Sequence, residues 1–308
     1  MNTQLFKYVL EVEKSRSISQ AAEKLFMAQP NLSKAIREVE DTLGFPVFRR
    51  SAKGVVPTEQ GEQFLAVARN VVAQLDRIDA ISACGKAAQT VSVSIPRASY
   101  VADGFLRFAR SLDSGEAMEL KMRETSSMKT LAGITGGDCS LGVIRCTPEN
   151  KQYFLDYMAG KGLSCDMLWD GECVLLMSRQ HPLAATEKIS EAQLSAFIRV
   201  VHGDEVVPFV TTERRTGEQC SDKRISVCDR ANQFELLCGL DGAYMWVSPV
   251  PQDVVTRYSL VQRRCQNSAR RFCDMLVYPE GYSFTKLDRL FIDKLYEAKN
   301  AVAFGDYK

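Results

Sequence analysis

Four polar side chains are concentrated in one short stretch of the chain, between Gln29 and Gly44. They are Asn31, Ser33, Lys34 and Arg37, and they occupy the outer face of a helical pattern, in its N-terminal half. The apolar residues of this pattern recur on the opposite face: Leu32, Ala35, Ile36, Val39 and Leu43. Amide, hydroxyl, ammonium and guanidinium groups at the start of a recognition helix contact base edges and phosphates in the major groove. The stretch therefore predicts a helix that binds duplex DNA.

The same charges also admit a simpler interpretation. Lys34 with Glu38, and Arg37 with Asp41, have the i,i+4 spacing of ion pairs on a solvated helix. In that case these side chains are ordinary surface residues, and the helix has no ligand. The residues of this helix alone do not decide between the two interpretations.

Two short helices joined by a tight turn are predicted to position these side chains. Ser17 followed by Gln20 has the spacing of a capping box, which begins the first helix. Its inward stripe consists of Ile18, Ala21, Ala22 and Leu25. Pro30 is favourable in the first turn of the second helix, where the backbone N–H groups have no partner within the helix, and Gly44 ends that helix.

The segment 21–50, AAEKLFMAQPNLSKAIREVEDTLGFPVFRR, followed by VPTEQG at 56–61, closely resembles the N-terminal domain of LysR-type transcriptional regulators. The resemblance implies an all-α N-terminal part, a winged helix-turn-helix domain over residues 1–58. It implies DNA contacts from Gln29, Pro30, Ser33, Lys34 and Arg37, with Arg49, Arg50 and Lys53 on the wing; Asn31 and Thr58 complete the candidate DNA-binding set. Ala28 departs from the family, which commonly has a Ser or Thr cap there.

The overall charge is small, but the predicted DNA-binding domain is basic. The whole chain of 308 residues carries a formal net charge of +1. Residues 1–58 contain nine lysines and arginines against six acidic residues, a net charge of +3. Since net charge over a whole chain says little about one face of one domain, the neutral total does not oppose DNA binding.

A long helix with a heptad seam is predicted over residues 59–89, the linker and hinge. Phe64, Ala68, Val71, Leu75 and Ile78 recur at alternating spacings of four and three. A single helix cannot bury such a stripe alone, which favours pairing with the same helix of a second subunit. The alternative is that the stripe packs on the core of its own domain. The family resemblance favours dimerisation, as a dimer or a tetramer.

Residues 90–308 alternate strand-like and helix-like patterns, which predicts βαβ units and parallel sheets covered by helices. The region resembles the effector-binding part of the same family, two α/β subdomains arranged like a periplasmic solute-binding protein. Subdomain I is expected at 90–163 and 267–308, and subdomain II at 164–266. The crossovers between them are expected near 161–164 and 264–267.

An effector site is expected between these subdomains, at the carboxyl ends of the strands. The resemblance places Arg97, Ser99, Ser126, Ser127 and Arg145 there from the first subdomain, and His202 and Asp229 from the second. Helix N-termini and arginines attract anions, so the predicted effector is a small organic acid, with Arg97 and Ser127 as the main carboxylate contacts. Alternatively, Arg97 and Arg145 only pair with acidic residues at the rim.

Motifs of other functional classes are missing from the sequence. No serine-hydrolase, metalloprotease, phosphate-loop or dinucleotide motif is present, so an enzyme and a cofactor are not expected. The ten cysteines form no C-x-x-C pair and there are only two histidines, so a metal site is not expected either. A thiol-based redox switch is one alternative, with Cys220 and Cys228 as the nearest pair.

The predicted protein is a homo-oligomeric transcriptional regulator that binds an operator and a small-molecule effector, with RNA polymerase as a further candidate partner. No apolar run reaches the roughly 20 residues of a membrane span, and a cytoplasmic location is expected. Besides the redox switch, one alternative is a ligand-binding protein whose DNA-binding domain is degenerate. The presence of Ser33, Lys34, Arg37 and Arg50 argues against that alternative.

Overall fold

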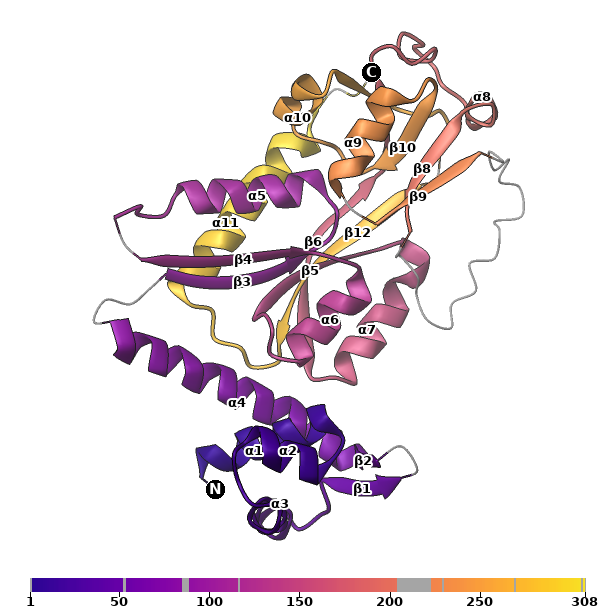
Figure 1. Cartoon of the computed structure of the whole chain (residues 1–308). Coiled ribbons are helices and arrows are strands. Elements are labelled where there is room, and N and C mark those ends of the chain that lie inside the picture. Colours follow the sequence, from indigo (N-terminus) through magenta and orange to yellow (C-terminus); the bar gives the residue numbers. More distant parts are fainter. Residues whose placement is uncertain are drawn as a thin grey trace. The chain divides into compact units, whose positions relative to one another are not determined.

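The computed structural model describes residues 2–51, 54–84, 89–115, 117–203, 223–228, 230–268, 270–305 and 307. The chain divides into two compact units, the first consisting mainly of residues 1–89 and the second of the remainder apart from two short segments (Figure 1). Among the candidate residues, Lys53 and Asp229 lie outside the described residues, as does the side chain of Ile78.

The first unit is a winged helix-turn-helix domain followed by a long helix. Its elements are α1 (Thr3–Ser15), α2 (Ile18–Lys24), α3 (Gln29–Leu43), β1 (Phe48–Ser51), β2 (Gly54–Pro57) and α4 (Glu59–Cys84). β1 and β2 form the antiparallel wing, with Arg49 opposite Val56. Leu32, Ile36 and Val39 of α3 are buried in the core with residues of α1.

Local signals in the sequence account for the ends of α2 and α3. The Ser17 hydroxyl accepts a hydrogen bond from the backbone N–H of Gln20 at 3.4 Å, which is half of the predicted capping box. α3 begins at Gln29 with Pro30 in its first turn, and the preceding Ala28 provides no side-chain cap. Gly44 ends α3 with φ of 77°, in the left-handed region that glycine adopts without strain.

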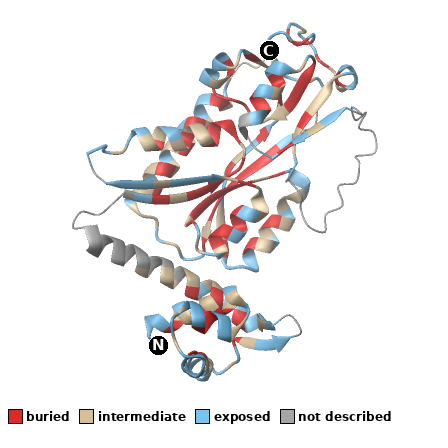
Figure 2. Cartoon of the chain, in the orientation of Figure 1, coloured by how far each residue is buried: buried red, intermediate tan, exposed pale blue. Residues whose placement is uncertain are grey.

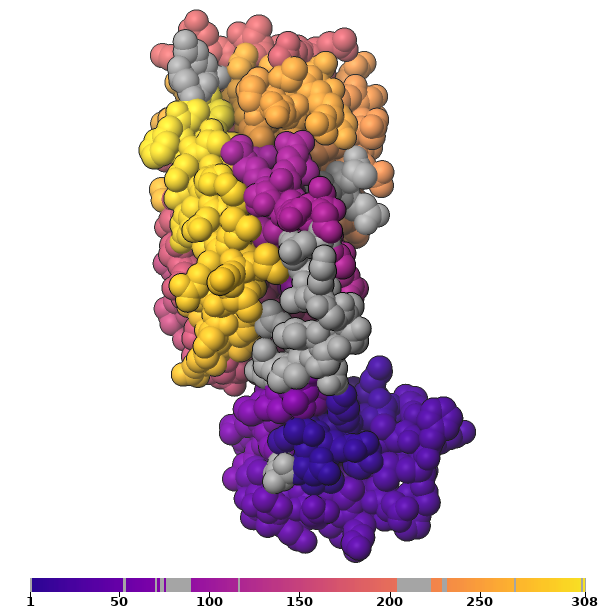
Figure 3. Space-filling view, turned by 90° about the vertical axis from the view of Figure 1, so that its left-hand side faces the viewer, coloured from indigo at the N-terminus to yellow at the C-terminus, as the bar shows by residue number. Residues whose placement is uncertain are grey.

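The second unit contains two five-stranded sheets. The first has the order β4 (Met118–Glu124), β3 (Gln89–Ile95), β5 (Leu141–Cys146), β12 (Arg271–Pro279) and β6 (Leu163–Glu172). Helices α5 (Ser99–Arg110) and α11 (Lys286–Ala303) lie side by side on one face (Figure 3), and α6 (Ser127–Thr135) and α7 (Lys151–Ala159) cover the other. A short 3-10 helix, η1 (Pro148–Asn150), precedes α7. The buried residues are concentrated in the central strands (Figure 2).

The second sheet has the order β11 (Leu260–Arg263), β7 (Val174–Ser178), β10 (Ala243–Val247), β8 (Ile198–His202) and β9 (Arg224–Val227). Its helices are α8 (Glu191–Leu194), α9 (Arg230–Gly239) and α10 (Gln252–Arg257). β8 pairs in parallel with β9 and β10, whereas β7 is antiparallel to β10 and β11. Among the helices of the described chain, none combines the length and the hydropathy needed to cross a bilayer.

Two details of the expected subdomains differ from the structure. β6 belongs to the first sheet, antiparallel to β12, so the first crossover lies at Cys173 and not near 161–164. The second crossover spans 264–270, which includes the expected 264–267. Both sheets are mixed rather than parallel, because β12 and β7 each run antiparallel to their neighbours. Only Cys173 separates β6 from β7, and only sheet pairing assigns the two strands to different subdomains.

Candidate functional site

The outer face of α3 presents the polar residues that the sequence places there. Gln29, Pro30, Asn31, Lys34 and Arg37 are exposed, and Ser33 is half-buried. The opposite face is buried in the domain core. One face of α3 makes the packing contacts with the domain core, so the other face is available for a ligand.

The predicted surface ion pairs of α3 are not formed. Within the described part of the chain, Lys34 and Arg37 have no ion pair with Glu38 or Asp41. The charge of both cations is therefore not neutralised within the domain. This favours the DNA-binding interpretation over that of a solvated helix face.

The wing presents Arg49 and Arg50, both exposed on β1. Glu40 of α3 attaches the wing to the helix: its Oε1 accepts hydrogen bonds from the backbone N–H groups of Val47 at 2.8 Å and Phe48 at 3.1 Å. Glu40 is not among the residues predicted from the sequence, because its acidic side chain gives no local sign of this role. The carboxylate fixes where the wing arginines lie relative to α3.

Thr58 is a positioning residue in the structure. Its hydroxyl donates a hydrogen bond to the carbonyl of Pro46 at 2.7 Å and accepts one from the N–H of Gly61 at 2.9 Å. The side chain thus caps α4 and ties it to the segment that precedes the wing. Its only proton is used within the domain in this structure, and the expected DNA contact of Thr58 stays a prediction.

The first residues of the linker seam pack within their own chain. The Phe64 ring lies 6.0 Å from that of Phe6, and Ala68 is fully buried. Val71 and Leu75 are half-buried. The alternative of intramolecular packing therefore holds for Phe64 and Ala68, whereas a dimer contact through Val71 and Leu75 stays a prediction.

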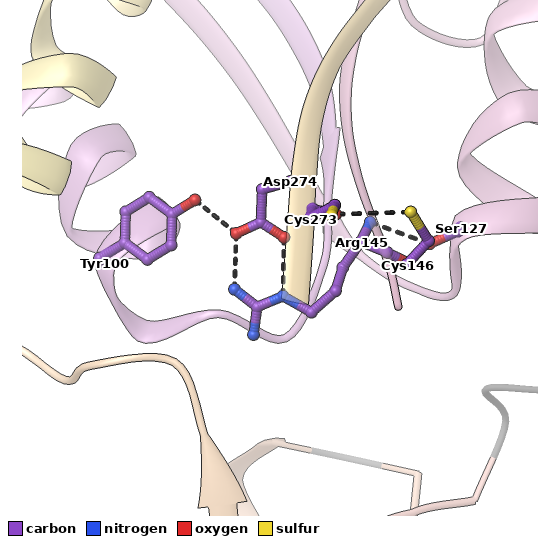
Figure 4. Close-up of polar contacts among 6 residues, drawn as sticks. All are labelled: Tyr100, Ser127, Arg145, Cys146, Cys273 and Asp274. Atoms are coloured by element: carbon purple, nitrogen blue, oxygen red, sulfur yellow. Dashed lines mark hydrogen bonds and ion pairs between the residues drawn. The ribbon is translucent and has the colours of Figure 1, made fainter. Parts of the chain in front are cut away.

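In the second unit, a buried ion pair lies at the carboxyl end of β5. The Nε and Nη2 atoms of Arg145 donate hydrogen bonds to the two carboxylate oxygens of Asp274 at 2.7 and 2.6 Å (Figure 4). The Tyr100 hydroxyl, from the first turn of α5, donates to the same carboxylate. Asp274 is completely buried. Asp274 and Tyr100 are not among the site residues predicted from the sequence.

The electrostatics of this cluster leave Arg145 neutralised. Burial alone would lower the pKa of Arg145, but the charge and hydrogen bonds of Asp274 outweigh it and raise that pKa. Burial and the Asp274 charge raise the pKa of Tyr100 well above its ordinary value. At neutral pH the cluster contains one cation, one anion and a neutral phenol. The structure thus agrees with the alternative interpretation of Arg145, in which its guanidinium pairs with an acidic residue of the protein.

Aromatic rings enclose the ion pair. The Arg145 guanidinium lies 4.5 Å from the centre of the Phe272 ring. Trp169 makes edge contacts with Phe272 at 5.0 Å and with Tyr100 at 5.1 Å. Trp169 lies in β6 and Phe272 in β12, next to the two crossovers to the second sheet. The cluster thus joins β5, α5 and both crossover strands.

Ser127 uses its hydroxyl to position the start of α6. The Oγ atom donates to the carbonyl of Arg145 at 2.6 Å and accepts from its N–H at 3.0 Å (Figure 4). Since the single hydroxyl proton is used, Ser127 cannot donate a hydrogen bond to a carboxylate in this arrangement. The expected carboxylate contact from Ser127 stays a prediction, and it requires this hydroxyl to give up its bond to the Arg145 carbonyl.

The structure brings the remaining first-subdomain candidates to one edge of the first sheet. Arg97 follows β3, Ser99 begins α5 and Ser126 follows β4. The backbone N–H of Thr125 bonds to the carbonyl of Ile95 at 3.0 Å and holds the ends of β3 and β4 together. Arg97 and Ser126 are half-buried and Ser99 is buried. His202 ends β8 in the second sheet and is half-buried.

The cysteines that the structure pairs most closely are packing residues. Cys146 and Cys273 face each other on β5 and β12 and are buried. Burial, with the neighbouring Cys273, raises the pKa of Cys146 to about 12, so almost no reactive thiolate is present at neutral pH. Of the pair considered for a redox switch, Cys228 is exposed and Cys220 lies outside the described residues. Within the described ranges, no three His, Cys, Asp or Glu side chains are grouped for a metal ion.

Residues 3–62 match the family of bacterial regulatory helix-turn-helix proteins of the LysR type. The match spans the helix-turn-helix, the wing and the start of α4. Residues 3–62 are therefore a LysR-type helix-turn-helix domain, and the chain is similar over most of its length to transcriptional regulators of this type. The transcriptional regulator BudR of Raoultella terrigena is similar to this chain, at 25% identity over 82% of the chain and 86% of BudR.

Solved structures of full-length LysR-type regulators share the fold. An OxyR variant from Pseudomonas aeruginosa has a TM-score of 0.60 at 18% identity, covering 96% of this chain and 98% of OxyR. LysG from Corynebacterium glutamicum, solved with bound effector Arg, has a TM-score of 0.63 at 15% identity, covering 98% and 99%. The chain therefore shares the fold of these proteins, an N-terminal helix-turn-helix domain followed by two α/β subdomains. The matched helix-turn-helix domain and the similarity to BudR indicate a transcriptional regulator.

Proposed function

We propose that this LysR-type regulator reads its operator with α3 and the wing of paired subunits, and that a small organic acid regulates it from the edge of the first sheet. The observation that supports the DNA part is the unpaired Lys34 and Arg37 on the exposed face of α3. Gln29 and Asn31, the polar residues that precede them, lie in the first turn, which is the part of a recognition helix that reaches the bases.

Paired subunits determine the form of the operator. Two recognition helices related by a twofold axis contact half-sites about 10 base pairs apart or a multiple of that spacing. Selection of duplexes from a random library with the full chain is expected to return an imperfect palindrome. Selection of no common sequence would contradict the proposal.

Variants of α3 and the wing distinguish residues that read bases from residues that bind the phosphate backbone of DNA. Lys34→Ala and Arg37→Ala are each expected to weaken binding to the selected duplex by about 1–3 kcal/mol. Arg49→Ala is expected to weaken binding to all sequences alike and to reduce the salt dependence. Glu38→Ala, on the same helix, is the control. Unchanged affinity of the Lys34→Ala, Arg37→Ala double variant would contradict the assignment.

The effector part rests on the charge distribution at the sheet edge. Asp274 neutralises Arg145, so Arg97 is the arginine that we assign to an effector carboxylate. It lies at the carboxyl end of β3, just before α5. The residue that caps α5, Ala98, offers no side-chain acceptor to the first-turn N–H groups. Arg97 and these N–H groups together favour an anion.

Calorimetric screening of small metabolites against the full chain tests this part. Organic acids are expected to bind, and Arg97→Ala is expected to weaken binding of the identified acid about tenfold or more. Arg110→Ala, at the other end of α5, is the control and is expected to bind as the wild type does. A cationic or wholly apolar effector, or an unaffected Arg97→Ala variant, would contradict the proposed site.

A further inference from the structure

Phe26 lies in the turn between α2 and α3 in an unusual conformation. Its φ is +52°, in the left-handed region, and its side chain is 98% exposed. The N–H of Met27 bonds to the carbonyl of Ala22 at 3.0 Å and that of Phe26 to the carbonyl of Glu23 at 3.1 Å. These two bonds form a Schellman motif, in which the residue at the Phe26 position is usually glycine or asparagine.

Neither local conformation nor packing explains an aromatic residue at this position. A bulky side chain in the left-handed region is strained, and the exposed ring gains no burial that could offset this. Arg16 also has a left-handed conformation, but its carbonyl accepts a hydrogen bond from Val55 of the wing at 2.9 Å. Strain without a local gain is a sign of a ligand contact that the free protein lacks.

The position of Phe26 indicates what its ligand is. Three residues further along the chain, α3 begins at Gln29, and residues 28–31 are all exposed. The ring therefore lies next to the N-terminal end of α3, and this is the end that we propose enters the major groove. Apolar side chains, Phe among them, contact the 5-methyl group of thymine there. We propose that Phe26 reads a thymine methyl group at the edge of each half-site, a proposal that rests on DNA binding through α3.

Deoxyuridine substitution tests the contact directly, because it removes only the methyl group. The probe is the duplex that the full-length wild-type protein selects from a random library. Replacing its thymines one at a time is expected to identify one position per half-site where wild-type affinity falls about three- to tenfold. Phe26→Ala is expected to lose a similar factor on the thymine duplex and to be insensitive to the methyl group at that position.

Two further variants distinguish a lost contact from a damaged domain. Phe26→Gly relieves the backbone strain, so it is expected to raise the urea midpoint of unfolding while still losing the methyl dependence. Phe304→Ala removes an equally exposed ring, 88% accessible, from the end of the second unit and is expected to bind DNA as the wild type does.

The outcomes separate this proposal from DNA binding by α3. If Lys34→Ala weakens binding but Phe26→Ala does not, the DNA-binding function stands and the Phe26 contact is wrong. Loss of affinity in Phe26→Ala with a retained response to every deoxyuridine substitution would overturn the thymine contact. Unchanged DNA affinity with altered transcription from the operator would assign the ring to a protein partner and would also overturn it.

Discussion

Arg145 and Asp274 illustrate how a single residue changes the chemistry expected of a site. Arg145 lies where an effector anion could be bound, yet both carboxylate oxygens of Asp274 occupy its Nε and Nη2 groups. Because Asp274 is completely buried, its charge depends on Arg145 and the Tyr100 hydroxyl for compensation. The pair therefore stabilises the structure of the first subdomain, and Arg145 is not the arginine that we propose for an effector carboxylate.

Removing one partner of this pair is expected to be costly. Asp274→Ala leaves the Arg145 cation, whose side chain is only 18% exposed, without its partner, which destabilises the second unit by about 3–5 kcal/mol. The control is Asp170→Ala, whose pair with Arg271 at 2.7 Å has both side chains more than 40% exposed; its loss is expected to cost about 0–1 kcal/mol. Urea unfolding monitored by tryptophan fluorescence measures both. Equal effects of the two variants would contradict the role of the buried pair.

His181 is expected to make stability depend on pH. It is 5% exposed, its Nδ1 accepts a hydrogen bond from the N–H of Leu183 at 3.0 Å, and burial lowers its pKa below 6.5. As pH falls below about 6.5, the unfolded chain binds a proton that the folded chain does not, so stability decreases. This decrease in stability ends once the pH is below the pKa of His181 in the folded state, because both states then bind the proton. Urea midpoints between pH 8 and pH 5 are expected to depend less on pH in His181→Asn; an unchanged slope would assign the effect to other groups.

At the scale of elements, short-range signals position α3 and a longer-range contact positions the wing. Pro30 and Gly44 lie at the two ends of α3, where their backbone preferences match the structure. The wing depends on Glu40, whose carboxylate accepts from two successive backbone N–H groups. One face of α3 thus carries the residues proposed to read bases. Another face carries Glu40, which anchors the wing.

Glu40→Ala is expected to weaken DNA binding without removing a DNA contact. Two N–H groups lose their acceptor, which costs about 1–3 kcal/mol of stability, and the wing arginines lose their fixed position. Affinity for the selected duplex and the urea midpoint of the first unit are both expected to fall. Glu38→Ala, exposed on the same helix, is the control. A normal DNA affinity in Glu40→Ala would show that the wing is held by its hairpin alone.

At the scale of the whole molecule, the function proposed for α4 depends on a second subunit. Phe64 and Ala68 are used in packing within the chain, so pairing is expected from Val71 onward. The share of the seam available for dimerisation is therefore smaller than the heptad pattern suggests.

Leu75→Glu tests the remaining seam. Two like charges without partners would be placed in the paired stripe, which is strongly unfavourable, so the oligomer is expected to dissociate and operator affinity to collapse. Leu75→Met keeps the volume and apolar character and is expected to retain the native mass. Sedimentation of both variants gives the result. A native mass for Leu75→Glu would assign the stripe to another contact.

The sequence alone determined the elements whose ends depend on neighbouring residues. The helix-turn-helix, the inward and outward faces of α3, and most strands of the two sheets follow from caps, turn residues and hydrophobic periodicity, which act over a few positions. The partner of Arg145 lies 129 residues away, and only the alignment of β12 beside β5 identifies it. The same holds for β6, because Cys173 alone separates it from β7 and only its pairing with β12 assigns it to the first sheet. Tertiary structure decided these features because they depend on the register between strands distant in the chain, on which local sequence carries no information.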